Sequence, residues 1–186
     1  MVDGNPCRKY NYFMSDKEQI QKSLHAFVLP AYNEIPDVGL YLDQVTKYIN
    51  SFLGDFPGLE VTPSMISNYV KLKMVSKANR KMYSREQIAY FIFIVLAKTV
   101  LSMDSIQDIF AIRENVCTVE QGYEYFRKEL IGVLHAFYAP SARDPRPDGV
   151  REEIRMLYNV VVTIAHKMYL DMYFRIRKMR ENEKEG

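Results

Sequence analysis

Residues 62–83 read TPSMISNYVKLKMVSKANRKMY and join a helix-start signal to a short amphipathic segment and a basic loop. Thr62 suits the N-cap, and Pro63 suits the first helical position because its missing N–H would have no partner there. A short helix beside a basic loop is typical of a winged helix-turn-helix, which inserts the helix in a major groove and contacts phosphates with the loop. No acidic residue interrupts the cations, which are Lys71, Lys73, Lys77, Arg80, Lys81 and Arg85.

The composition limits where such contacts can lie. The chain has 186 residues, enough for one domain or a small domain with a helical extension, and 48% of them are hydrophobic. Because the formal net charge is only +2, any nucleic-acid contact must come from a local patch. The cysteines, Cys7 and Cys117, form no disulfide framework, and neither a signal segment nor a membrane-length apolar run is present. We therefore expect a soluble cytoplasmic protein.

Apolar spacing predicts helices on both sides of the basic stretch. From Leu40 to Leu53 the apolar residues recur at three- and four-residue steps, and Asp37 is the candidate N-cap. Residues 74–83 lose this spacing, which favours a two-stranded wing with its turn near Ala78 and Asn79. Within residues 62–71 and just beyond, the expected buried stripe is Met65, Ile66, Tyr69 and Leu72.

The second half of the chain is predicted to be helical. Ser84 and Thr118 each open a capping box with a Gln three residues later, Ser102 caps a short helix, and the helix after Ser84 is apolar almost all round. A long helix is expected from about residue 150 to 179, followed by a fraying polar end. Its apolar residues have heptad-like spacing and are Ile154, Leu157, Val161, Ile164 and Met168.

These elements predict a mainly α fold in three parts. Residues 1–27 would be a loosely held N-terminal arm, and residues 28–112 a winged helix-turn-helix module with a small two-stranded wing. Residues 113–186 would form a helical hairpin with one long helix, for dimerisation and for a possible effector.

The order of parts from Leu40 to Phe110 resembles the DNA-binding domain of the MerR-type regulators. That family has the segment Val-Ser-Pro-x-Thr-Leu-Arg-Tyr-Tyr, then Gly-Leu, then a wing that ends Arg-x-Tyr-Ser. Here Val61-Thr62-Pro63 matches the opening, and Lys81-Met82-Tyr83-Ser84 matches the exit of the wing. Ser67 stands where the family has Arg, and Lys73 stands where it has Gly.

A closer resemblance is to a bacterial family of uncharacterised proteins, domain-of-unknown-function family number eighteen thirty-six. The phrases LPAYNEIPDVGLYLDQV (29–45), MISNYVK (65–71) and YSREQIAY (83–90) carry it, over about residues 28–112. That family supplies no biochemistry. The MerR-type resemblance implies that helix 62–71 lies in the major groove and that Tyr69, Lys81 and Tyr83 touch the phosphate backbone.

The candidate contacts fall into two classes. Side chains on the outer face of helix 62–71 would read bases, since Asn pairs with adenine and Lys reaches guanine; they are Ser64, Ser67, Asn68 and Lys71. The N-cap, the wing 73–83 and the residues beside them would contact phosphates, through Thr62, Tyr69, Lys73, Lys77, Arg80, Lys81, Tyr83 and Arg85. Tyr69 and Tyr83 have the alternative role of core aromatics.

Other chemistry has little support in the sequence. The histidines, His25, His135 and His166, show no metal-ligand spacing, so core or interface roles are favoured, although His135 and His166 lie on helices expected to pack together. Cys117 precedes a helix N-terminus, which on its own is weak evidence for a redox or metal sensor. No phosphate loop or nucleophile elbow occurs, and we predict no enzyme, cofactor or metal site.

The sequence thus predicts a bacterial transcription regulator that binds double-stranded DNA as a homodimer through its C-terminal helices. The alternative is a winged-helix module that binds proteins and no DNA. Aromatic and methionine residues of the C-terminal helices could bind a small hydrophobic effector, although helix packing or a dimer seam is their favoured role. The residues concerned are Met156, Tyr158, Met168, Tyr169, Met172, Tyr173 and Phe174.

Overall fold

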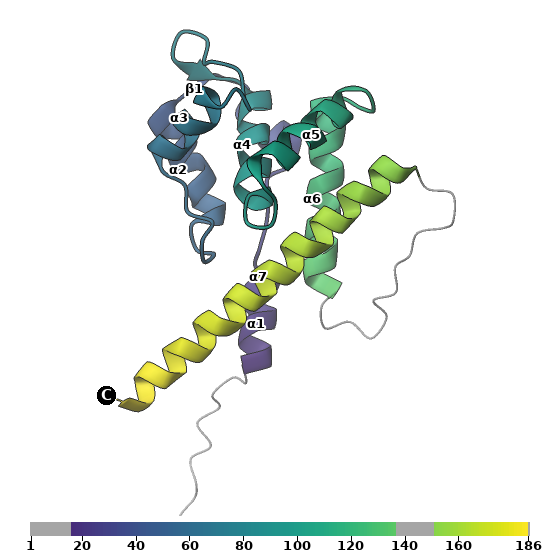
Figure 1. Ribbon diagram of the computed structural model, residues 1–186. Helices are drawn as coiled ribbons and strands as arrows, with labels where there is room; N and C mark the ends of the chain where they lie inside the picture. Colours follow the sequence, from purple (N-terminus) through teal and green to yellow (C-terminus); the bar gives the residue numbers. More distant parts are fainter. Residues whose placement is uncertain (1–15, 137–150, 186) are drawn as a thin grey trace, which may run out of the picture.

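A computed structural model of the chain describes residues 16–136 and 151–185. The expectations for residues 1–15, which include Cys7, and for the proline-containing loop within 137–150 lie outside these residues. The described residues form a mainly helical fold of seven α-helices, one 3-10 turn and a small two-stranded antiparallel sheet (Figure 1). Among them, no helix is both long and apolar enough to cross a membrane.

The predicted module contains both strands, three complete helices and most of a fourth, α5, which is described below. Asn50 joins the first two helices, because its side-chain amide donates to the Val61 carbonyl and accepts from the Val61 N–H, both at 2.8 Å. This clamp fixes the chain where it enters the second helix. The elements are β1 (Leu40–Tyr41), α2 (Leu42–Leu53), α3 (Pro63–Lys71), β2 (Met82–Tyr83) and α4 (Arg85–Ala97), and the 3-10 turn η1 (Tyr32–Glu34) precedes them.

The start of α2 corrects the prediction of Asp37 as its N-cap. The helix begins after Tyr41, whose backbone N–H donates to Oε1 of Gln44 at 2.9 Å. Asp37 lies upstream in the exposed segment before β1. The side chain of Gln44 thus satisfies the N–H of the N-cap residue, while Tyr41 provides no side-chain cap of its own.

The sheet also differs from the predicted wing. β2 pairs with β1 and not with a strand inside residues 74–81, and Leu40 faces Tyr83 in the register. The strands approach closely because residue 39 is Gly: a Cβ there would lie 2.8 Å from Cβ of Met82. The predicted internal hairpin survives only as one bridge, from Asn79 to Met82.

The predicted caps of the later helices are confirmed. Ser84 and Gln87 form the capping box of α4, Ser102 caps α5 (Met103–Glu114), and Thr118 with Gln121 opens α6 (Val119–Ala136). Helix α4 is the central core helix that the sequence predicts, because nearly all of its residues from Gln87 onwards are buried.

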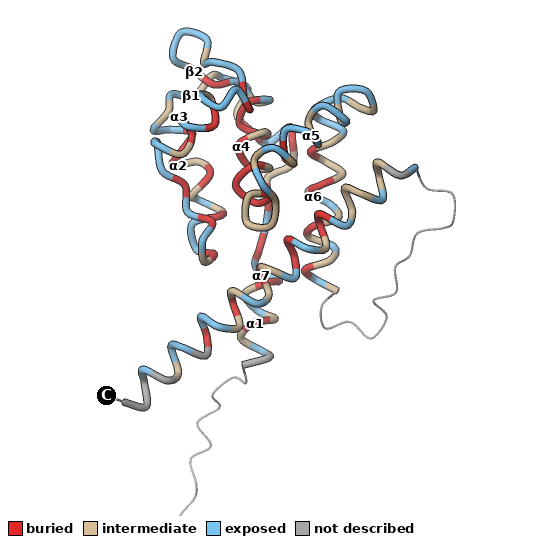
Figure 2. Tube along the Cα trace, in the orientation of Figure 1, coloured by how far each residue is buried: buried red, intermediate tan, exposed pale blue. Residues whose placement is uncertain are grey.

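The two ends of the described chain are more ordered than the sequence predicts. Part of the expected loose arm forms α1 (Asp16–His25), which packs on α6 and on α7 (Glu152–Glu185) (Figures 1 and 2). Ile20 and Leu24 of α1 are buried. The polar end expected to fray instead continues α7 to Glu185.

A single hydrophobic core runs through both halves of the chain, from α1 to α7. Val161, Ile164 and Met168, three residues of the predicted heptad seam, are buried in this core within one protomer. Helix α1, which the sequence did not predict, is among the helices that pack on α7. The seam is therefore not an open dimer surface.

Candidate nucleic-acid interface

Helix α3 presents a polar outer face. Oγ1 of Thr62 accepts a hydrogen bond from the Met65 N–H at 3.3 Å, as predicted for the N-cap. Ile66 and Tyr69 are buried, whereas Leu72, expected in the stripe, follows the last turn and is 44% exposed. On the outer side the base-reading candidates Ser64, Asn68 and Lys71 are exposed and Ser67 is half-buried.

The C-terminal end of α3 closes with a left-handed residue. The Met74 N–H donates to the Tyr69 carbonyl and the Lys73 N–H to the Val70 carbonyl, both at 3.0 Å, which is the Schellman pattern. Lys73 has a φ of 58°, a conformation that favours Gly at this position. The helix end therefore places an exposed lysine where a glycine would be less strained.

The basic loop folds into a tight turn at its tip. Arg80 and Lys81 have φ values of 48° and 66°, and Asn79 and Met82 exchange backbone hydrogen bonds across them at 2.9 and 3.0 Å. Two consecutive positive φ values at the centre of a two-residue loop define a type I′ turn, in which Asn-Gly is usual. The turn thus lies at Arg80 and Lys81, two residues beyond the predicted position.

The beginning of the loop is anchored to the core. Nε2 of the buried Gln87 donates to the carbonyls of Ser76 at 2.8 Å and of Lys77 at 3.3 Å. At its other end β2 joins the loop to β1. The tip is therefore held at both ends while it projects beyond the rest of the module (Figure 2).

The charge of this surface is not neutralised by the described part of the chain. The exposed cations of α3 and of the basic loop have no ion pair to any described carboxylate. Since α3 and the loop contain no acidic residue, the formal charge of these two segments is entirely positive. These cations, which are called the basic surface below, are Lys71, Lys73, Lys77, Arg80 and Lys81.

Three phosphate candidates are placed elsewhere. Arg85 is turned inward, where its Nε donates to the Ile35 carbonyl at 2.8 Å and lies 3.9 Å from Oδ1 of Asp37. Tyr83 is buried, with its ring edge-on to Phe91. Tyr69 is 4% exposed, and its buried hydroxyl has no hydrogen-bond partner in the described residues. Burial also raises the pKa of Tyr69 to about 12. These residues support the surface from behind.

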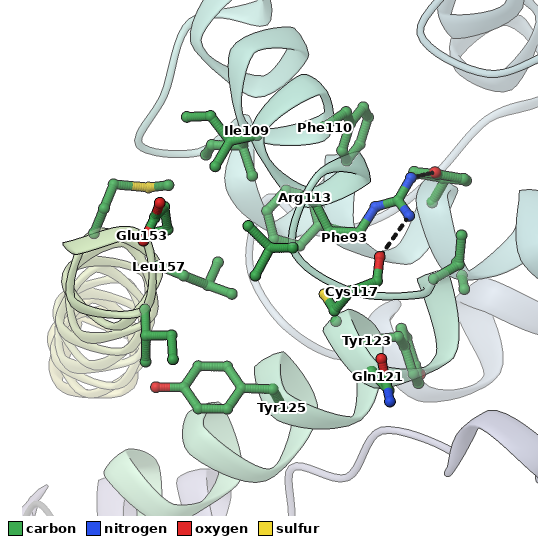
Figure 3. Close-up of a pocket in the computed structure, with 18 of the residues that line it drawn as sticks. Phe93, Ile109, Phe110, Arg113, Cys117, Gln121, Tyr123, Tyr125, Glu153 and Leu157 are labelled. Carbon is green, nitrogen blue, oxygen red and sulfur yellow. Dashed lines mark hydrogen bonds between the residues drawn. The ribbon is translucent and has the colours of Figure 1, made fainter. Parts of the chain in front are cut away.

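The notable cavity lies apart from this surface, between α4, α5, α6 and the start of α7 (Figure 3). Of the residues predicted for a hydrophobic effector, Met156 lines it, whereas Met168 and Met172 are buried in the core. The sequence did not indicate Tyr90 or Arg113, which also line it. They belong to different helices, so no local spacing connects them.

Two of the histidines meet where α1 packs on α6. His135 stacks on His25 with ring centroids 4.7 Å apart, and both residues are exposed. Helix α1 supplies this partner, whereas His166 is exposed on α7. The arrangement is an interhelical ring contact.

Comparison with known proteins gives one result. No curated protein and no solved structure matches the chain significantly. A family model, described as a domain of unknown function, matches residues 30–126, a little over half of the chain. The match includes α2, α3, the basic loop, α4 and α5, so it covers the whole basic surface. The chain therefore belongs to the family described as "Domain of unknown function (DUF1836)".

Proposed function

We propose that the protein is a DNA-binding transcription regulator of the cytoplasm. Helix α3 lies in the major groove and loop residues 73–83 lie on the phosphates. The observation that carries the proposal is the left-handed backbone conformation at three cations of the basic surface. The non-glycine residues with positive φ in the described chain are Lys73, Arg80 and Lys81, all exposed cations.

The positive φ values support a functional role because glycine would be less strained at each position. A left-handed backbone costs a residue with a Cβ roughly 1–2 kcal/mol. Strain of this kind concentrates at sites where a side chain performs a function. Here the side chain at each strained position is a long cation. Several such cations on one surface suit the regularly spaced phosphates of a nucleic-acid backbone.

The shape of the surface agrees with a duplex. An α-helix such as α3 has a diameter of about 10–12 Å with its side chains, which fits the ~12 Å width of the major groove of B-DNA. Its exposed residues Ser64 and Asn68 are small enough to let the helix approach base edges. Lys71 extends the same face toward the loop.

The finer likeness to MerR-type regulators is part of the proposal. Lys73 stands where that pattern has Gly, and its left-handed φ is the conformation that Gly would adopt. The strand that pairs with the wing comes from residues before α2. The alternative, a protein-binding module without DNA, would be favoured by carboxylates of the C-terminal half over the basic surface, and no described ion pair of this kind occurs.

We propose further that the regulator is a homodimer through the C-terminal half of α7. With the predicted seam buried, the exposed apolar residues of this half are Leu170, Phe174 and Met179. Leu170 and Phe174 lie one turn apart on one face of α7, while Met172 and Ile176 of the same stretch are buried against the protomer. Two copies of α3 would read a symmetric site.

The test is selection of bound duplexes from a random pool, followed by titration of the selected site across a salt series. Five exposed cations predict a slope of log K against log salt of about −4 to −5. Lys81→Gly should reduce the steepness of this slope by about 1 and weaken binding to all sequences, while Asn68→Ala should relax preference at one base pair.

The glycine substitution separates function from folding. Lys81→Gly relieves a positive φ, so it should raise the free energy of unfolding by roughly 0.5–1 kcal/mol while it weakens DNA binding. Lys22→Ala, which removes an exposed cation of α1, is the control and should change neither slope nor specificity. Equal binding by Lys81→Gly and the parent would rule out the proposed contact, and no enriched site would rule out the function.

A further inference from the structure

The cavity of about 380 Å³ between α4, α5, α6 and the start of α7 has the dimensions of a small-molecule site. Most of its lining is apolar, and α5, α6 and α7 converge on it in Figure 3. An apolar ligand would make dispersion contacts with this lining. The side chains used in the argument are Phe93, Ile109, Phe110, Val116 and Leu157.

Two cations lie in this lining, Arg151 at its edge beside Glu153 and Arg113 among the apolar side chains. Nη1 of Arg113 donates to the Cys117 carbonyl at 3.1 Å (Figure 3), and Nη2 donates to the hydroxyl of Tyr90. Its Nε is buried and has no hydrogen-bond partner in the described residues. The Nε is closed off from the cavity, so the donors that remain for a ligand are the second hydrogens of Nη1 and Nη2.

The carboxylate that pairs with Arg113 leaves its charge largely uncompensated. Oε1 of Glu114 lies 3.8 Å from Nη2, and the Glu114 side chain is 70% exposed, so solvent screens the pair. Glu153, in the lining, lies 3.5 Å from Nε of Arg151. The cavity therefore combines an apolar body with one partly unsatisfied cation.

Tyr90 adds a second polar group at the same point. Its ring packs edge-on against Phe110, and the guanidinium of Arg113 lies 5.7 Å from its centroid. Burial raises the pKa of Tyr90, so the phenol stays protonated at neutral pH. While its oxygen accepts from Arg113, the phenol has its own hydrogen to donate.

We propose that this cavity binds a small, largely apolar carboxylate, with the carboxylate beside Arg113 and Tyr90 and the apolar body among the side chains of α5, α6 and α7. An aliphatic or an aromatic acid shares this chemistry. Arginine and a phenol together are suited to a carboxylate, because both donate hydrogen bonds and one carries positive charge. An amine of the same shape would be repelled.

The wall of the cavity is bonded to the proposed DNA-reading helix. Nε2 of Gln107, on α5, donates to the carbonyl of Leu72 at the end of α3, at 3.1 Å. Ile109 and Phe110, the next apolar residues of α5, line the cavity. Ligand binding itself does not depend on the proposed DNA contact, so the experiment below tests it without DNA.

The experiment is calorimetric titration of the full chain with decanoate, decanol and decylamine, in parallel with benzoate. Decanoate should bind, decanol should bind about tenfold more weakly, and decylamine should not bind. Tighter binding of benzoate than of decanoate would show that the cavity prefers a short aromatic acid, and the reverse would show that it prefers a long aliphatic one. No binding of either acid, or binding of decanol as tight as that of decanoate, would overturn the assignment.

Two variants locate the site. Val116→Phe fills the cavity and should abolish decanoate binding, whereas Val28→Phe places the same added volume at an exposed position and should leave it unchanged. Arg113→Met keeps an unbranched stem and should reduce the affinity for decanoate about tenfold with little effect on decanol. Decanoate binding unchanged in Val116→Phe would place the ligand elsewhere and overturn the proposal, and thermal unfolding of each variant verifies that it folds.

Discussion

At the scale of single residues, conformation and charge favour different side chains on the basic surface. Backbone conformation at Lys73, Arg80 and Lys81 favours glycine, yet all three are cations. The conflict cannot be read from the sequence, because any of these residues would be unremarkable in a loop with negative φ. Only the closure of α3 and the type I′ turn show the strain. The three-dimensional backbone thus separates these cations from others that are merely exposed.

Tyr69 provides a prediction at this scale. Its hydroxyl is buried and has no hydrogen-bond partner in the described structure, so Tyr69→Phe should raise the free energy of unfolding by about 1 kcal/mol. Burial raises the pKa of Tyr69 from 10.0 to about 12, so the phenol ionises in the unfolded chain before it ionises in the folded one. The free energy of unfolding is therefore unaffected by this group below pH 10 and falls as the pH rises toward 12. The variant should lack this part of the alkaline loss, as measured by urea denaturation at several pH values.

The same variant also tests the role of Tyr69 at the interface. A phosphate contact through the hydroxyl would make Tyr69→Phe bind DNA more weakly than the parent. Because the ring is packed in the core, we expect unchanged DNA affinity. Weaker binding without loss of stability would show that the hydroxyl reaches the duplex.

At the scale of elements, Gln87 links a helix start to the basic loop. It accepts from the Ser84 N–H at 2.9 Å and donates to the carbonyls of Ser76 and Lys77. Gln121 makes the equivalent capping box on α6, at an exposed position. The two glutamines therefore share one local function, and only Gln87 has the long-range one.

Gln87→Ala should lower the free energy of unfolding by about 2 kcal/mol, because it removes a cap and leaves two partly buried loop carbonyls without their donor. Gln121→Ala, the matched control, should cost only about 0.5–1 kcal/mol. Hydrogen exchange should become faster for the amides from Ser76 to Lys81 in the first variant alone. Equal effects of the two substitutions would show that the loop is held by other contacts.

At the scale of the whole molecule, the long helix has two halves with different surroundings. Its earlier part contributes Val161, Ile164 and Met168 to the core shared with α1 and α6. Its later part buries Met172 and Ile176 on one side and exposes Leu170 and Phe174 on another. The dimer surface proposed here is therefore the later part. Heptad spacing alone could not distinguish a seam within a protomer from a seam between protomers, since both bury apolar residues at the same intervals.

The double substitution Leu170→Lys and Phe174→Lys should halve the molar mass measured by light scattering. Both residues are substantially exposed, at 47% and 62%, so the thermal stability of the protomer should change little. Val38→Lys, at an equally exposed apolar position before β1, should leave the molar mass unchanged. A parent protein that is monomeric at micromolar concentration would overturn the dimer.

The amino-acid sequence by itself determined the local features of this protein. The Thr62 cap and its Pro63, the Ser84 and Thr118 boxes, the bounds of α3 and the burial of α4 depend on residues within about four positions of one another, so their signals can be read along the chain. The concentration of cations between residues 71 and 85 is equally visible there.

Tertiary structure alone decided which distant segments meet. β2 pairs with residues before α2, α1 covers α6 and α7, and Tyr90 meets Arg113 beside a cavity. Each of these contacts depends on which of several similar apolar faces or strands pack together. The packing of the whole core determines the partner of each face. Periodicity shows that a face is buried, but packing decides which partner buries it.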